Sequence, residues 1–92
     1  MAKIDFTHLE VPVSFDGTKQ MFNVAKSLGN AMMYNGSVLM DIGFEDLARR
    51  IYYSEGEVEV EGKYVAPIEQ VVKDSNLIAT IKREIIRKLR NG

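Results

Sequence analysis

The sequence predicts a mostly helical α+β domain, with about four helices, an N-terminal β-hairpin and a short extended segment at residues 57–61. Two observations support this prediction. After residue 24, apolar residues recur mostly at intervals of three and four, which is the spacing of a helix that buries one face. Before that point, and again at 57–61, polar and apolar residues alternate as they do in a half-buried strand.

Length and composition restrict the classes of protein that need to be considered. Ninety-two residues are enough for one hydrophobic core, so we expect residues 1–92 to form a single domain. The net charge of −1 is too small to steer the chain to nucleic acid or a membrane by itself. The absence of cysteine excludes disulfides, a thiolate nucleophile and a cysteine zinc site. With no apolar run of signal-peptide or membrane-spanning length, we expect a cytoplasmic protein without membrane contact or cofactor.

The first strand is expected at residues 11–15. Val11, Val13 and Phe15 alternate there and share one face. Pro12 has no amide hydrogen to donate to a neighbouring strand, so this strand is expected at the edge of its sheet.

The loop of the hairpin follows from the turn dipeptide at 16–17 and from matching apolar residues across the strands. A two-residue loop would set Val13 opposite Gln20. A four-residue loop at 16–19 sets Val13 opposite Phe22 and pairs apolar with apolar residues along both strands. Because a one-residue slip sends every side chain to the other face, we prefer the longer loop.

The first helix is expected from Val24 for about three turns, with Asn35 and Gly36 as its left-handed stop. Gly29 lies inside this helix, where glycine costs roughly 1 kcal/mol relative to alanine. We therefore expect another element to pack closely against it.

The second helix is expected at residues 41–54, between a capping Asp41 and a closing Gly56. Its apolar seam consists of Met40, Phe44, Leu47 and Ile51. Its outer faces carry two acid-before-base pairs, Glu45 with Arg49 and Asp46 with Arg50.

The segment after this helix alternates glutamate with Val58 and Val60, which predicts a strand with a solvated, self-repelling edge rather than a calcium loop. A third helix must begin near residues 63–66, because Pro67 is tolerated only in a first turn. Ser75 is expected to cap the last helix. The apolar seam of that helix is Ile78, Ile81, Ile85 and Leu89.

No catalytic or metal site is expected. His8 is the only histidine, and no second histidine or cysteine exists to complete a site with it. The sequence also lacks the glycine-rich phosphate loops and the nucleophile and zinc motifs of common enzyme classes.

Methionine and tyrosine are the clearest indication of an interaction surface, because together they exceed what one small core readily hides. These side chains adapt to partner surfaces, although a small core also uses them as filler. The residues expected at a protein interface are Met33, Tyr34, Tyr53 and Tyr64. The partner would be a second copy of the chain or another protein.

The last seventeen residues carry five cations against one carboxylate. Arg83, Arg87 and Arg90 fall within roughly 60° of one another on an ideal helix, opposite its apolar seam. This face suits phosphates, but cations also gather at helix C-termini because they offset the helix dipole.

The order of these pieces resembles that of small proteins encoded in bacteriophage and prophage gene clusters. The matching stretches, at residues 3–6, 16–17, 28–31, 46–52, 57–60 and 68–73, read KIDF, DG, LGNA, DLARRIY, EVEV and IEQVVK. The resemblance covers most of the chain and implies a viral or mobile-element context, in which such proteins carry no assigned catalytic residues. We therefore expect a non-enzymatic, oligomeric interaction protein, for example a phage accessory or assembly factor. The alternatives are a small nucleic-acid-binding module that uses the last helix, and an inhibitor that acts through the acidic edge.

Overall fold

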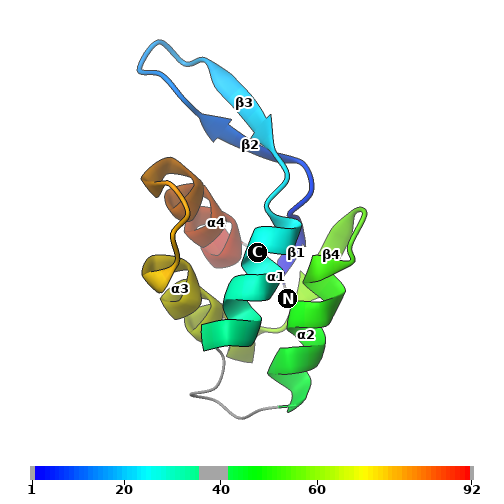
Figure 1. Cartoon of the computed structure of the whole chain (residues 1–92). Coiled ribbons are helices and arrows are strands. Elements are labelled where there is room, and N and C mark those ends of the chain that lie inside the picture. The colour runs from blue at the N-terminus through cyan, green and yellow to red at the C-terminus, as the bar shows by residue number, and fades with distance from the viewer. Residues whose placement is uncertain (1, 36–41, 92) are drawn as a thin grey trace.

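The computed structural model describes residues 2–35 and 42–91, and all structural statements below concern these residues. They form a mostly helical α+β fold with four α-helices, one short 3-10 helix and two small antiparallel sheets. Figure 1 shows the helices gathered in one body, from which the β2–β3 hairpin extends. The predicted fold class is confirmed.

The first sheet joins the beginning of the chain to its middle. β1 (Ala2–Asp5) pairs antiparallel with β4 (Glu57–Val60), with Ile4 opposite Val58. The predicted extended segment is thus a strand that buries both of its valines and leaves its glutamates exposed. Its partner β1 was not predicted from the sequence.

The hairpin has a different register from both registers considered above. β2 (Leu9–Pro12) pairs with β3 (Lys19–Phe22), with Leu9 opposite Phe22. Val13 donates its amide to the carbonyl of Thr18 at 2.9 Å, so the loop consists of residues 14–17. The predicted loop at 16–19 is wrong because burial on β2 stops at Val11, and Val13, which the prediction matched with Phe22, is 44% exposed. The sheet has two strands, so the expected edge position of Pro12 is confirmed.

Helix α1 (Ala25–Asn35) begins where the side chain of Asn23 accepts a hydrogen bond from its first amide at 3.2 Å. The close packing expected at Gly29 is confirmed, because a Cβ built on it would lie 2.8 Å from the Cβ of Tyr52. The predicted stop at Gly36 lies outside the described residues.

Helix α2 (Ile42–Tyr52) buries Phe44, Leu47 and Ile51, as its seam predicts. Met40 and Asp41 lie outside the described residues. The helix ends two residues earlier than expected, and Ser54 rather than Gly56 closes it. The hydroxyl of Ser54 donates to the carbonyl of Ile51 at 2.7 Å.

A 3-10 turn, η2 (Gly62–Tyr64), leads directly into α3 (Val65–Asp74). Pro67 is the third residue of α3, within the first turn, where its missing amide hydrogen removes no helical bond. The predicted start of this helix is therefore confirmed.

Helix α4 (Ala79–Asn91) buries Ile81, Ile85 and Leu89, but Ile78 precedes it and is 54% exposed. The expected cap at Ser75 is wrong, because its hydroxyl donates to the carbonyl of Val72 at 2.7 Å and so closes α3 instead. A serine between two helices can serve either end, and this one serves the helix before it.

One cluster of buried side chains lies among all four helices and both sheets. Its fully buried members include Phe6, Leu28, Ile51, Ile68 and Ile85, which come from every part of the described chain. None of the helices within residues 2–35 and 42–91 is long and apolar enough to cross a membrane.

Candidate functional site

A hollow beside exposed apolar side chains lies between α1 and α2. Gly29 allows the two backbones to approach, because a Cβ there would lie 3.0 Å from the carbonyl oxygen of Ala48. The approach leaves a half-open groove of about 210 Å³ over the contact. Its lining consists of Gly29, Asn30, Met33, Glu45, Ala48, Arg49, Tyr52 and Tyr53.

Two adjacent tyrosines form one side of this groove. The rings of Tyr52 and Tyr53 meet edge to face, with centroids 4.9 Å apart and planes at 76°. The ammonium of Lys26 lies 4.5 Å from the centroid of the Tyr52 ring, within the range of a cation–π contact. Tyr52 is thus held from two sides, whereas Tyr53 is 72% exposed.

The structure brings together two of the four residues expected at an interface. Met33, which is 60% exposed, lines the same groove as Tyr53. Tyr34 follows Met33 on α1 and is exposed, but it does not line the groove. Tyr64 is only 5% exposed, with its ring 5.9 Å from that of Phe44, so it belongs to the core and not to the surface.

The rim of the groove carries both signs of charge. Glu45 and Arg49 form an ion pair at 3.8 Å, and Asp46 and Arg50 form another at 3.2 Å, as their spacing predicts. All four side chains are more than half exposed, and pairs of this kind contribute at most about 1 kcal/mol. A partner with the complementary charges can therefore replace these contacts at small cost.

The three arginines expected to contact nucleic acid have different surroundings. Arg87 holds Glu84 through two nitrogens, one of them at 3.2 Å. Arg90 holds Glu69 on α3 through two more, at 2.9 and 3.3 Å. The side chain of Arg83 makes no hydrogen bond or ion pair with any residue within the described ranges, and it is exposed.

These contacts shift the titration of the groups involved. Hydrogen bonds from Arg87 hold the pKa of Glu84 below its ordinary value, and those from Arg90 do the same to the pKa of Glu69. The carboxylates in turn raise the pKa of both arginines. A phosphate at this face must therefore compete with two built-in carboxylates.

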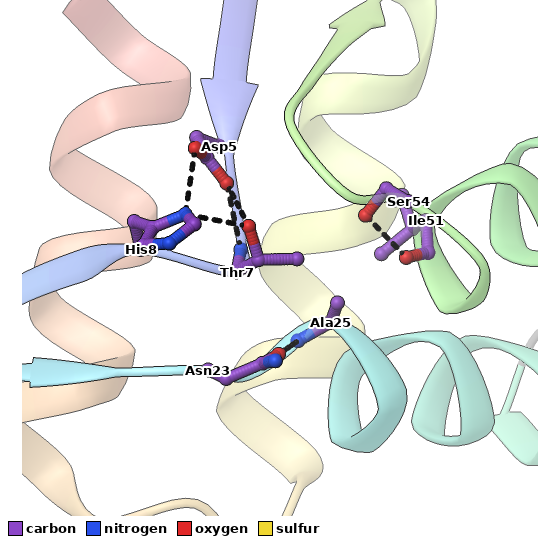
Figure 2. A network of polar contacts seen from close by, with 7 residues as sticks. All are labelled: Asp5, Thr7, His8, Asn23, Ala25, Ile51 and Ser54. Atoms are coloured by element: carbon purple, nitrogen blue, oxygen red, sulfur yellow. Dashed lines mark hydrogen bonds and ion pairs between the residues drawn. The ribbon is translucent and has the colours of Figure 1, made fainter.

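His8 lies in a polar cluster at the corner between β1 and β2 (Figure 2). Its Nδ1 is 3.1 Å from the Oδ2 of Asp5 and 2.9 Å from the hydroxyl of Thr7. The hydroxyl and the amide of Thr7 both donate to the other oxygen of Asp5, and the hydroxyl bond is the main cause that lowers the pKa of this carboxyl. Both contacts of the ring converge on one nitrogen, so His8 does not link Thr7 to Asp5 as the histidine of a catalytic triad links its partners. The cluster stabilises the corner.

A larger hollow of about 330 Å³ lies beside this corner and is lined mostly by charged groups of both signs. Its lining consists of Lys3, Ile4, Asp5, His8, Glu57, Arg87, Lys88 and Asn91. Among the described residues, no group of three or more histidine and acidic side chains is placed to hold a metal ion.

Two features of the surface were not predicted from the sequence. Gly29, Asn30 and Arg49 line the groove, and only the close packing at Gly29 was foreseen. Phe15, expected in a strand at residues 11–15, lies in the hairpin loop and is fully exposed. The Asp-Gly pair that directly follows this phenylalanine is typical of a turn, and it is the sequence signal for a position in the loop.

No protein-family model, curated protein or solved structure matches this chain.

Proposed function

We propose that this chain is a non-enzymatic interaction protein that binds a protein partner through the groove between α1 and α2. The observation that supports the proposal is that Met33 and Tyr53, both mostly exposed, flank a half-open groove of about 210 Å³. Methionine and tyrosine are enriched at protein interfaces, because one adapts its shape and the other adds a polar tip to a large apolar ring.

The resemblance to small bacteriophage and prophage proteins supports a role as an accessory or assembly factor in the cytoplasm of a host cell. In that role the partner is a second copy of this chain or another protein of the same assembly. The charged rim of the groove then fixes orientation more than it adds affinity.

Site-specific photo-crosslinking tests the proposal whatever the partner is. A photoreactive amino acid replaces Met33 in the groove, and the matched control replaces Ile42, which is 85% exposed but does not line the groove. We expect a discrete crosslinked protein species from position 33 in producing cells and none from position 42. A crosslink that is absent at 33, or equally strong at 42, would contradict the proposal.

The last helix supports a second candidate function, nucleic-acid binding. The observation that favours it is the side chain of Arg83. This cation is exposed, has no partner among the described residues and lies on a helix rich in positive charge. In this case the triple variant Arg83→Glu, Arg87→Glu, Arg90→Glu loses binding to a generic DNA duplex, and the affinity of the wild type falls steeply with salt. Arg49→Glu, on α2, serves as the control. Binding that is absent at low salt, or insensitive to the triple change, would exclude this function.

A further inference from the structure

The tip of the β2–β3 hairpin presents an apolar side chain that its own turn does not require. The amide of Gly17 donates to the carbonyl of Ser14 at 3.3 Å, and Gly17 has a φ of 93°. Asp16 accepts hydrogen bonds from the amide and hydroxyl of Thr18 at 2.8 and 2.6 Å. These bonds fix the loop, whereas Phe15 within it is fully exposed. Turn geometry favours small polar residues at such positions, so it does not explain a phenylalanine there.

The β2–β3 hairpin extends away from the helical body, as Figure 1 shows. Val13 and Met21 on the same hairpin are also about half exposed, at 44% and 52%. The hairpin is therefore an arm with an aromatic tip, and the buried Leu9 and Val11 of β2 anchor it to the helical body.

The groove between α1 and α2 has the size and lining to receive such a side chain. An apolar cavity of about 150 Å³ is enough to bind benzene, and the groove measures about 210 Å³. Tyr52 and Tyr53 offer ring edges and faces, and Met33 offers a thioether, all of which make favourable contacts with a phenyl ring.

The charges around the two surfaces are complementary. The arm carries Asp16 beside its tip and Lys19 at the start of β3, and the groove is lined by Arg49 and Glu45. Asp16 and Arg49 have opposite signs, so an ion pair between them at the rim of the contact would set its orientation.

We infer that the arm of one copy of this chain inserts Phe15 into the α1–α2 groove of a second copy. The inference rests on the proposed function, because it takes the same groove as the binding surface and names its occupant. The contact is heterologous, since arm and groove are different surfaces, so repetition leads to a ring or a filament rather than stopping at a symmetric dimer.

The experiment measures molar mass by light scattering over a range of concentrations. Phe15→Ser removes the tip and leaves the groove, and Met33→Glu places a charge in the groove and leaves the arm. Val13→Ser is the control on the same hairpin, where the side chain is 44% exposed but not at the tip. Circular dichroism verifies that each variant keeps the wild-type fold.

We expect the wild type and Val13→Ser to assemble as concentration rises, and each of the other two variants to be monomeric at tenfold higher concentration. Mixing Phe15→Ser with Met33→Glu should give a dimer with one copy of each, because one supplies the groove and the other the arm. A symmetric groove-to-groove contact cannot produce this rescue.

Other outcomes separate this inference from the proposed function. If Phe15→Ser assembles like the wild type while Met33→Glu does not, the groove is an interface but the arm is not its occupant. If the crosslink from position 33 contains only a different protein, or the wild type is monomeric at all concentrations, the inference is likewise overturned. An assembly that neither variant weakens overturns the inference too. If, in addition, the photo-crosslinking experiment gives no crosslink from position 33, the proposed function is overturned as well.

Discussion

Replacing Gly29 by alanine tests the close contact that creates the groove. In an ordinary helix this change stabilises by about 1 kcal/mol. Here the new Cβ would lie 2.8 Å from the Cβ of Tyr52, 3.0 Å from the carbonyl oxygen of Ala48 and 3.1 Å from the Cα of Tyr52. These atoms belong to the backbone of α2 or are attached directly to it, so relief requires the two helices to move apart.

The balance of the two effects gives the expected magnitude. Overpacking of this kind costs about 1–3 kcal/mol, and the rigid neighbours of Gly29 place it at the upper end of that range. After the gain in helix propensity, we expect a net loss of about 2 kcal/mol in the free energy of unfolding. For a domain of this size, that lowers the melting temperature by roughly 8–16 °C.

Thermal and urea unfolding followed by circular dichroism measure this loss. Gly56→Ala is the matched control, because a Cβ at Gly56 meets nothing within 4 Å and its backbone is not left-handed. The control should be neutral or slightly stabilising. A Gly29→Ala protein as stable as the control would refute the argument that α1 and α2 touch at this glycine.

Three further changes test other parts of the structure. Because hydrogen bonds hold the pKa of Glu84 below its ordinary value of 4.5, the carboxylate stabilises the fold above that pH and loses this effect as pH falls through the lowered pKa. Urea unfolding from pH 7 to 3 should therefore show Glu84→Gln less stable than the wild type at neutral pH and the difference shrinking in acid, and a constant difference would be contrary to this account. Ile85→Ala should lower the free energy of unfolding by about 3 kcal/mol, and Ile86→Ala, at a partly buried position, by clearly less in the same assay; equal losses would contradict the burial pattern. Tyr64→Ala should lower the melting temperature strongly while Tyr53→Ala barely changes it, because only the first ring is buried, and the opposite order would place the wrong tyrosine in the core.

The helices could be predicted because the residues that define them act locally. Phe44, Leu47 and Ile51 specify a face of α2 by spacing alone, and Pro67 limits the start of α3 to a few positions. Gly29 indicated a close neighbour, although not which helix supplies it.

The strands were harder to predict because their pairing depends on residues that are distant in the sequence or exposed in the structure. β1 is four residues long, and what makes it a strand is its pairing with β4, far along the chain. In the hairpin, the bonds of Asp16 and Gly17 within the turn determine the register, whereas matching of apolar residues assumed a covered face that Val13 does not have.

The residues of the candidate site were likewise predicted only in part. Met33 and Tyr53 stand out in the sequence as adaptable apolar residues, and both proved exposed at the groove. Tyr64 has the same composition signal and is buried, because a tyrosine suits a core as well as a surface. The local signal for its burial is spacing, because Tyr64 precedes the buried Ile68 and Val71 at the intervals of one helix face.

The pairing of β1 with β4 has a consequence for the synthesis of this protein. A ribosome produces residues 2–5 long before residues 57–60, so β1 remains without its partner after the residues of the hairpin, α1 and α2 have been synthesised. During this interval Ile4 and the open edge of β1 are accessible to chaperones and proteases. Chains that terminate before β4 cannot cover this edge by pairing. We therefore expect cellular quality control to remove them.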